Sequence, residues 1–419
     1  MVRYISLFLI LFSFTNCSSI NINRQQVYSS DSSNENSLLL LAMDYRIHGN
    51  FQESSKLFKK LYTSTHKKGY LVEYFKTLNE GGFFSKVIEE SKNFQIDSDE
   101  ERREVGKSYF LLQDFPNALK MYSEISNPID MDFRFLAEIY FQLKDYKKAF
   151  ENIQKAYQID PAPELVLSMA KIEYIYFGNI QKAISLLNSH NKLYQFSDEV
   201  AQYLAKIYRD IGKNVEALEI YRELYKKRQK EEYAIAIIEL LSYLSKTDEL
   251  IEFLEKSQVS SELLLRLYMS NREYEKGYRL SQKLLESDTK NPYLLAQNAI
   301  FEYKVNIAKK EKLEKFLPDV IEKLEKSVYQ LQDASYFNYL GYIMIDHDYR
   351  IRDGMKYIKM ALEIEPDSYY IIDSLAWGEY KLKNCDVAYE IMKKVVENLG
   401  LEDSEIREHW EKIRKCNGD

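Results

Sequence analysis

The sequence predicts an all-α fold, a solenoid of about ten to eleven antiparallel helix pairs that ends in a C-terminal capping helix. Three observations support this class. A pattern of apolar and small residues recurs about every 34 residues. Gly (13) and Pro (7) are scarce among 419 residues, which disfavours turn-rich β folds. Hydrophobic residues make up 45% and charged residues 29%, as in a folded soluble body.

Two distant stretches, residues 133–161 and 336–366, show the repeated unit most clearly. Each has an apolar residue, then a small residue, then a large apolar one, a break, and a second apolar-periodic run that closes at Pro161 or Pro366. This is the pattern of two antiparallel helices. One such pair cannot bury its own apolar stripe, so neighbouring pairs must stack on it.

Residues 1–16 are predicted to be a lipoprotein-type signal peptide. A short positive start is followed by the apolar run Tyr4–Phe14, which is too short to span a bilayer. The run leads into Cys17 and resembles a bacterial lipoprotein signal, in which this cysteine carries the lipid. Phe14 and Asn16 depart from the usual Leu and small residue of such signals. An ordinary secretory signal and an uncleaved anchor stay open as alternatives.

Residues 17–37 are predicted to be a flexible tether. Ser18–Ser37 contains seven Ser and four Asn and cannot bury a core. With Cys17 lipidated, the chain would be anchored to a bacterial membrane, and the Ser after the cysteine resembles the outer-membrane sorting class. The body would then face the periplasm.

Residues 38–290 are predicted to form an N-terminal array of eight helix pairs. Small residues such as Ala149 and Ala217 should lie where the two helices of a pair approach most closely. The pairs begin near these residues: Leu38, Tyr70, Val105, Phe133, Glu164, Leu204, Tyr233 and Leu264.

Residues 291–333 break the period, and residues 334–419 return to it as a C-terminal array with its capping helix. Pro318 interrupts an otherwise helical run and should end or kink the helix. The segment is predicted to be an irregular pair at a junction, with a bend of the superhelix or an inserted helix as alternatives. The terminal helix should run from Glu402 to Lys415.

The repeats resemble those of tetratricopeptide repeat proteins. The small residue follows Leu in the first helix of several pairs, at Ala137, Ala205 and Gly341, and the run from Asn338 to Trp377 is similar to the C-terminal repeats of bacterial envelope lipoproteins of this class. Gly354 stands for the usual Ala and Ala376 for the usual Gly, so close packing is expected to survive. The resemblance implies a right-handed superhelix whose inner face, lined by first helices, binds an extended peptide or a partner helix.

The resemblance places six residues of the C-terminal pairs on this inner face as candidate partner-binding residues. They are Asn338, Tyr342, Tyr370, Asp373, Trp377 and Tyr380. Tyr and Trp with a few polar groups suit a peptide groove. The alternative is that the aromatic residues are core and that Trp377 packs against the terminal helix.

Inward positions in the middle of the array are more charged and could favour an acidic ligand, although a solvated inner wall is the simpler interpretation. They are Arg103, Lys107, Arg134, Lys206, Arg209 and Arg266.

No catalytic or metal-binding motif is present in the sequence. The five His residues are scattered, so we expect no metal site, no small-molecule cofactor and no enzymatic activity. The net charge of −7 and the lack of a basic stripe argue against nucleic acid as a partner. An unrecognised hydrolase or transferase site within 292–333 is the alternative from a different class.

Cys385 and Cys416 are 31 residues apart, at similar levels of adjacent helices, and could form a disulfide in an oxidising periplasm. Stacked helices usually lie about 8–10 Å apart, which is wider than a disulfide tolerates. Two free buried thiols are therefore the default expectation.

The signal, the tether and the repeats together predict a lipid-anchored scaffold that mediates protein–protein interactions in the bacterial cell envelope. The alternative is an adaptor that recruits a periplasmic protease or cell-wall enzyme and presents its substrate.

Overall fold

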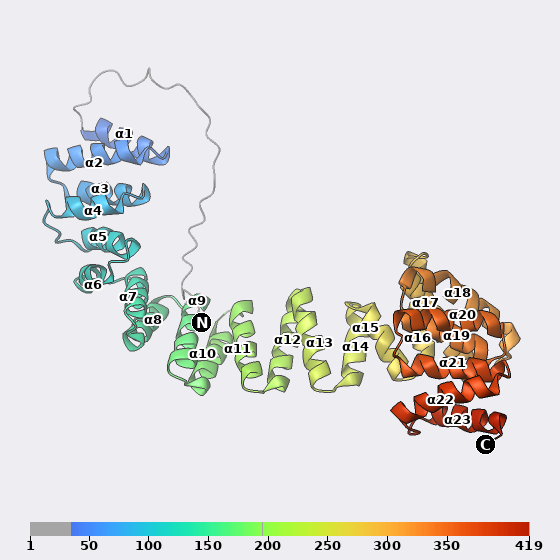
Figure 1. Cartoon of the computed structure of the whole chain (residues 1–419). Helices are drawn as coiled ribbons and strands as arrows, with labels where there is room; N and C mark the ends of the chain where they lie inside the picture. Colours follow the sequence, from blue (N-terminus) through green and yellow to red (C-terminus); the bar gives the residue numbers. More distant parts are fainter. Residues whose placement is uncertain (1–34, 195, 419) are drawn as a thin grey trace, which may run out of the picture. The chain divides into compact units, whose positions relative to one another are not determined.

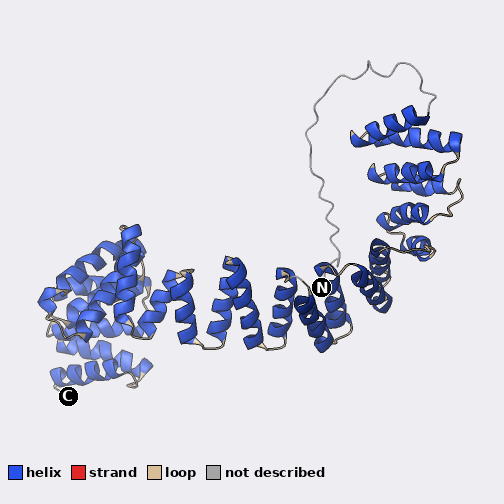
Figure 2. Cartoon of the chain, turned by 180° about the vertical axis from the view of Figure 1, so that it is seen from behind, coloured by secondary structure: helices blue, strands red, loops and turns tan. Residues whose placement is uncertain are grey.

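The computed structural model describes residues 35–194 and 196–418, and the regular elements within these ranges are all helices (Figures 1 and 2). Consecutive helices pack on one another along the chain, first within pairs and then between pairs. The prediction of an all-α solenoid is therefore confirmed. The chain divides into two compact units, residues 1–240 and residues 241–419, which are described separately.

Unit 1 is built from successive helix pairs, and its last helix, α13, crosses the unit boundary. Its elements are α1 (Glu35–Ile47), α2 (Phe51–Thr65), α3 (Lys68–Glu80), α4 (Phe84–Ser91), α5 (Asp99–Leu111), α6 (Phe115–Ser123), α7 (Asp130–Gln142), α8 (Tyr146–Ile159), α9 (Pro163–Lys171), the π-helical turn η1 (Ile172–Tyr176), α10 (Ile180–Leu193), α11 (Asp198–Asp210), α12 (Asn214–Arg228) and α13 (Glu231–Tyr243).

Unit 2 continues the same plan and ends in a single helix. Its elements are α14 (Thr247–Ser257), α15 (Ser261–Ser270), α16 (Tyr274–Ser287), α17 (Pro292–Ala308), the short 3-10 turn η2 (Leu313–Lys315), α18 (Leu317–Leu331), α19 (Ala334–Asp346), α20 (Ile351–Ile364), α21 (Tyr369–Lys381), α22 (Cys385–Leu399) and α23 (Ser404–Asn417).

Local sequence signals determine where these helices begin and turn. At the start of α5 the Ser98 hydroxyl accepts a hydrogen bond from the Glu101 amide, and the Glu101 carboxylate accepts one from the Ser98 amide, both at 3.2 Å. This capping box satisfies backbone donors that the helix leaves without partners. The tight turns within pairs use residues with positive φ, for example Lys144 (63°) and Gly212 (75°).

Small residues set the spacing of the helices within each pair. Ala149 and Ala217 are fully buried, as the period predicts. The backbones of α19 and α20 approach closely: a Cβ atom on Gly341 would lie 2.7 Å from the Gly354 carbonyl oxygen, and one on Gly354 would lie 2.8 Å from the Gly341 oxygen. The two glycines are therefore not interchangeable with alanine here, because each backbone occupies the space that the other's side chain would need.

Two predicted features can be compared with the observed helix boundaries: the start of the array and the effect of Pro318. Helix α1 begins at Glu35, three residues before the expected start of the array at Leu38. Pro318 lies in the first turn of α18, where its missing N–H removes no helical hydrogen bond. The helical run predicted around Pro318 is thus divided into two elements, η2 and α18. Of the two expected effects of the proline, an ended helix or a kinked helix, the structure shows the first.

The predicted segment 291–333 corresponds to α17, η2 and α18. Its apolar residues join those of α19 to α21 in one core, which includes Val320, Leu340 and Trp377. The division between compact units falls instead at Leu240 and Leu241, so the junction role of 291–333 stays a prediction.

The predicted signal peptide, Cys17 and most of the predicted tether lie outside the described residues. Among the helices that the structure describes, none combines the length and the apolar character needed to cross a bilayer.

Candidate functional site

One hollow of unit 2 is lined by the first helices of three successive pairs. Its volume is about 590 Å³. Helix α15 contributes Glu262, Arg266, Met269 and Ser270; α17 contributes Tyr293, Gln297, Ile300 and Lys304; and α19 contributes Tyr336 and Tyr339. We call this hollow the α15–α17–α19 groove. Residues spaced three or four apart on each helix form its wall, since that spacing keeps them on one helical face.

Tyrosine hydroxyls supply most of the polar chemistry of the groove. The Gln297 amide donates a hydrogen bond of 2.8 Å to the Tyr336 hydroxyl. The buried Tyr339 hydroxyl has no hydrogen-bond partner among the residues that the structure describes. Burial raises the pKa of Tyr339, and it raises that of Tyr293 to about 12. These hydroxyls therefore keep their protons at neutral pH and can donate to a ligand.

The charges of the groove are not balanced. Glu262 and Arg266 neutralise each other through an ion pair of 3.0 Å on α15. The Lys304 ammonium group lies 5.8 Å from the centre of the Tyr303 ring and 6.0 Å from that of Tyr339. It pairs with no carboxylate of the described residues, so the groove carries one unneutralised positive charge beside its aromatic wall.

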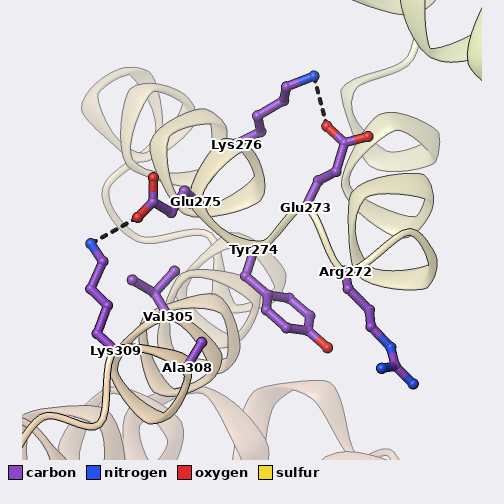
Figure 3. Close-up of a pocket in the computed structure, with 8 residues that line it drawn as sticks. All are labelled: Arg272, Glu273, Tyr274, Glu275, Lys276, Val305, Ala308 and Lys309. Atoms are coloured by element: carbon purple, nitrogen blue, oxygen red, sulfur yellow. Dashed lines mark ion pairs between the residues drawn. The ribbon is translucent and has the colours of Figure 1, made fainter.

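A second hollow of unit 2, with a volume of about 370 Å³, lies at the turn between α15 and α16 and against the end of α17 (Figure 3). Ion pairs from Glu273 to Lys276 at 2.6 Å and from Glu275 to Lys309 at 2.8 Å occupy its rim. Its charged groups are largely paired with one another, so it offers less to a ligand than the α15–α17–α19 groove.

The six residues predicted for partner binding differ in exposure: one is exposed, two are buried and three are partly buried. Tyr370 is 61% exposed, whereas Asp373 is 6% and Trp377 is 3% exposed. Asn338, Tyr342 and Tyr380 are partly buried. Tyr380 stacks on Trp377 with ring centres 4.8 Å apart. Asp373 and Trp377 are thus not open to a partner in this structure, and the binding role of the set stays a prediction.

The terminal helix α23 covers Asp373 and Trp377. The His409 ring stacks on Trp377 at 4.1 Å with an interplanar angle of 13°, and its Nδ1 lies 3.0 Å from an Asp373 carboxylate oxygen. Glu405 of the same helix hydrogen bonds to Tyr342, and burial together with that bond raises the pKa of Tyr342. The alternative interpretation of Trp377, that it packs against the terminal helix, is the one that the structure shows.

The two cysteines lie closer together than the expectation of free thiols allows. Cys385 begins α22 and Cys416 is near the end of α23, and their Cα atoms are 5.5 Å apart. The structure joins them as a disulfide. The argument from helix spacing was wrong here, because it used the distance between helix axes, whereas these side chains lie at neighbouring helix ends and both face the shared interface.

Most of the predicted inward cations are held in ion pairs. Arg103 pairs with Asp132 at 3.0 Å, Arg134 with Glu164 at 2.8 Å, and Arg209 with Glu239 at 3.3 Å. This agrees with the interpretation of a solvated, self-neutralised inner wall for these arginines. Lys206 is an exception, because it lies near the Tyr203 ring and forms no ion pair with the described residues.

In the segment 292–333, the alternative site for an enzyme, the acidic residues Glu302 and Asp319 both pair with Lys323, at 2.6 and 3.0 Å. Across the described residues no group of His, Cys, Asp and Glu side chains is arranged to hold a metal ion.

Sequence reasoning missed the α15–α17–α19 groove, although it named Arg266 as inward. The signal was present in the spacing of Tyr293, Gln297, Ile300 and Lys304 on one face of α17. The repeat pattern does not identify these residues as inward, because α17 belongs to the segment 291–333, which breaks the period.

The fold defines the protein as an α-solenoid of stacked antiparallel helix pairs. No family model and no curated protein matches the chain. Among solved structures, the chain is similar to the APC/C hetero-tetramer Cut9–Hcn1, with 10% identity over 91% of this chain and 96% of that chain, at a TM-score of 0.39. It is also similar to Naa15/Naa10 bound to HypK-THB, with 15% identity over 91% of this chain and 66% of that chain, at 0.39. A likeness to MamA has 19% identity over 36% of this chain and 93% of that chain, at 0.33.

Proposed function

We propose that the protein is a lipid-anchored scaffold of the bacterial cell envelope, which binds an extended segment of another protein in the α15–α17–α19 groove. The observation that supports binding is the groove itself, in which Tyr293 of α17 and Tyr336 and Tyr339 of α19 line the wall beside the ammonium group of Lys304. Aromatic rings that keep one polar end are suited to burying a partner's side chains while bonding to its backbone.

The charge of the groove indicates what the segment carries. The hydroxyl of Tyr339 lacks a partner, and Lys304 lacks a carboxylate among the described residues. A backbone carbonyl can accept from the first group, and an acidic side chain or terminal carboxylate can pair with the second. The segment is therefore apolar with at least one carboxylate, and it is extended, because the groove crosses three helices rather than following one.

A displayed library of random peptides, selected on the purified protein, tests this proposal. We expect enriched peptides to bear acidic residues. Titration of one synthetic winner should show at least about a tenfold loss of affinity with Tyr336→Ala and with Lys304→Glu, as is usual when an aromatic anchor or a buried charge partner is removed.

Tyr243→Ala is the matched control, since Tyr243 belongs to the same unit and its side chain is 75% exposed. It should leave the affinity unchanged. If the selected peptides bind both groove variants as tightly as the natural chain, the groove is not the binding surface.

The anchor is a separate part of the proposal and depends on Cys17. Intact mass and detergent partitioning should show a diacylglyceryl-sized increase and a membrane-bound protein, and both should disappear in Cys17→Ala. An unlipidated protein that stays in the aqueous phase would remove the anchor and the envelope location while leaving the groove proposal standing.

A further inference from the structure

Two lysines on the first helices of unit 1 differ from the neighbouring inward cations. Arg103, Arg134 and Arg209 each pair with a carboxylate at 3.3 Å or less. Lys171 ends α9, Lys206 lies on α11, and neither ammonium group forms an ion pair or a hydrogen bond with the residues that the structure describes. In a chain with a net charge of −7, two adjacent cations without a carboxylate partner need an explanation.

Both ammonium groups converge on one tyrosine. The Nζ atom of Lys171 lies 5.7 Å from the centre of the Tyr203 ring, and that of Lys206 lies 6.0 Å from it. The Tyr203 hydroxyl is buried and, within residues 35–194 and 196–418, has no hydrogen-bond partner. Burial, with the charge of Lys206, lowers the pKa of Lys171. Two ammonium groups thus lie within 6.0 Å of the ring centre of a tyrosine whose hydroxyl is buried.

An acidic group, Asp210, lies close to Tyr203: burial first, and then the charges of Tyr174 and Asp210, raise the pKa of Tyr203 to about 12. The Asp210 carboxylate accepts a hydrogen bond of 3.0 Å from the Tyr174 hydroxyl. Tyr174 lies in the π-helical turn η1, which begins directly after Lys171 and is closed by a bond of 3.1 Å from the Phe177 amide to the Ile172 carbonyl. Wide turns of this kind are uncommon and occur frequently at functional sites.

The geometry points to an oxyanion-binding site formed by Lys171, Lys206 and Tyr203 on unit 1. A carboxylate or a phosphate placed between the two ammonium groups relieves their repulsion and accepts charge-assisted hydrogen bonds. The tyrosine hydroxyl donates a third bond once its side chain turns toward the ligand. The occupant that we assign is the side-chain carboxylate of an acidic protein segment. This site is independent of the groove in unit 2, and either can fail without the other.

The test uses the full chain and calorimetric titration with three probes. These are a terminally blocked oligoglutamate peptide, the same peptide with glutamine in place of glutamate, and inorganic phosphate. The variants are Lys171→Gln with Lys206→Gln, and Tyr203→Phe, which keeps the ring. The control is Lys120→Gln with Lys147→Gln, which removes the same charge from exposed positions on α6 and α8.

We expect the glutamate peptide to bind the natural chain and the control equally, and at least about tenfold more weakly to the double lysine variant. Tyr203→Phe should weaken binding severalfold, and the glutamine peptide should not bind. Competition by phosphate at similar concentration would show a general oxyanion site, and its absence would assign the site to carboxylates. Equal binding by the lysine variant, an equal loss in the control, or no binding of either anion to the natural chain would overturn the proposal. Unchanged melting temperatures confirm that the variants are folded.

Discussion

Replacing Asp373 with alanine should lower the free energy of unfolding of unit 2 by about 1–3 kcal/mol, the usual cost of leaving a buried hydrogen-bonding group without its partner. The Asp373 carboxylate contacts His409 Nδ1 through both oxygens, at 3.0 and 3.1 Å. The two residues are 6% and 3% exposed. Alanine would leave the His409 ring buried without its partner and would open a small void under α23.

Urea unfolding of the full chain, followed by circular dichroism, measures this loss. Asp367→Ala is the matched control, because Asp367 is exposed in the same unit and should change stability by less than about 0.5 kcal/mol. A double-mutant cycle with His409→Ala should show that the two losses do not add. A loss below about 1 kcal/mol for Asp373→Ala would mean that the pair does not hold α23 in solution.

Reduction of the Cys385–Cys416 disulfide should lower the stability of unit 2 by about 3 kcal/mol. The bond closes a loop between residues 31 apart, and opening a loop of this length restores conformational entropy to the unfolded chain. The bond also holds the end of α23 on α22, so its loss should let the terminal helix fray first. The same urea titration, with and without reductant, measures the change.

The control for reduction is the double variant Cys385→Ser with Cys416→Ser in a Cys17→Ala background. It should be insensitive to reductant and about as stable as the reduced natural chain. Alkylation without reductant gives the direct answer in the Cys17→Ala protein: no mass increase is expected. Addition of two alkyl groups would show that both thiols are free and would contradict the bond.

The repeat architecture could be predicted from the sequence because it depends on contacts between nearby residues. Ala149 and Ala217 lie at the close approach of paired helices, as the period indicates, and both are fully buried. Caps and turns are also local, which is why the start of α5 at Ser98 and the turn at Gly212 follow from a few residues. The small residues Gly341 and Gly354 could also be recognised from the sequence pattern, although the contact between their backbones could not.

The candidate sites could not be predicted in the same way, because they depend on which faces meet across separate pairs. The sequence left open whether Trp377 lines the inner face or packs against the terminal helix, and the structure shows that His409, 32 positions later, covers it. The α15–α17–α19 groove combines three helices, of which α17 belongs to the aperiodic segment. Lys206 was recognised as inward, but its meeting with Lys171 over Tyr203 was not.

Sequence by itself determined the class of fold, the order of the helix pairs and the positions of the small packing residues, since each is repeated in the chain and set by local periodicity. Tertiary structure alone decided which inner positions are open, which are covered by α23, and where Cys385 meets Cys416. The physical reason is that exposure and pairing belong to surfaces assembled from several helices. Whether a tyrosine or a lysine is buried in the core, lines a groove or binds a ligand depends on the neighbour that the fold places against it.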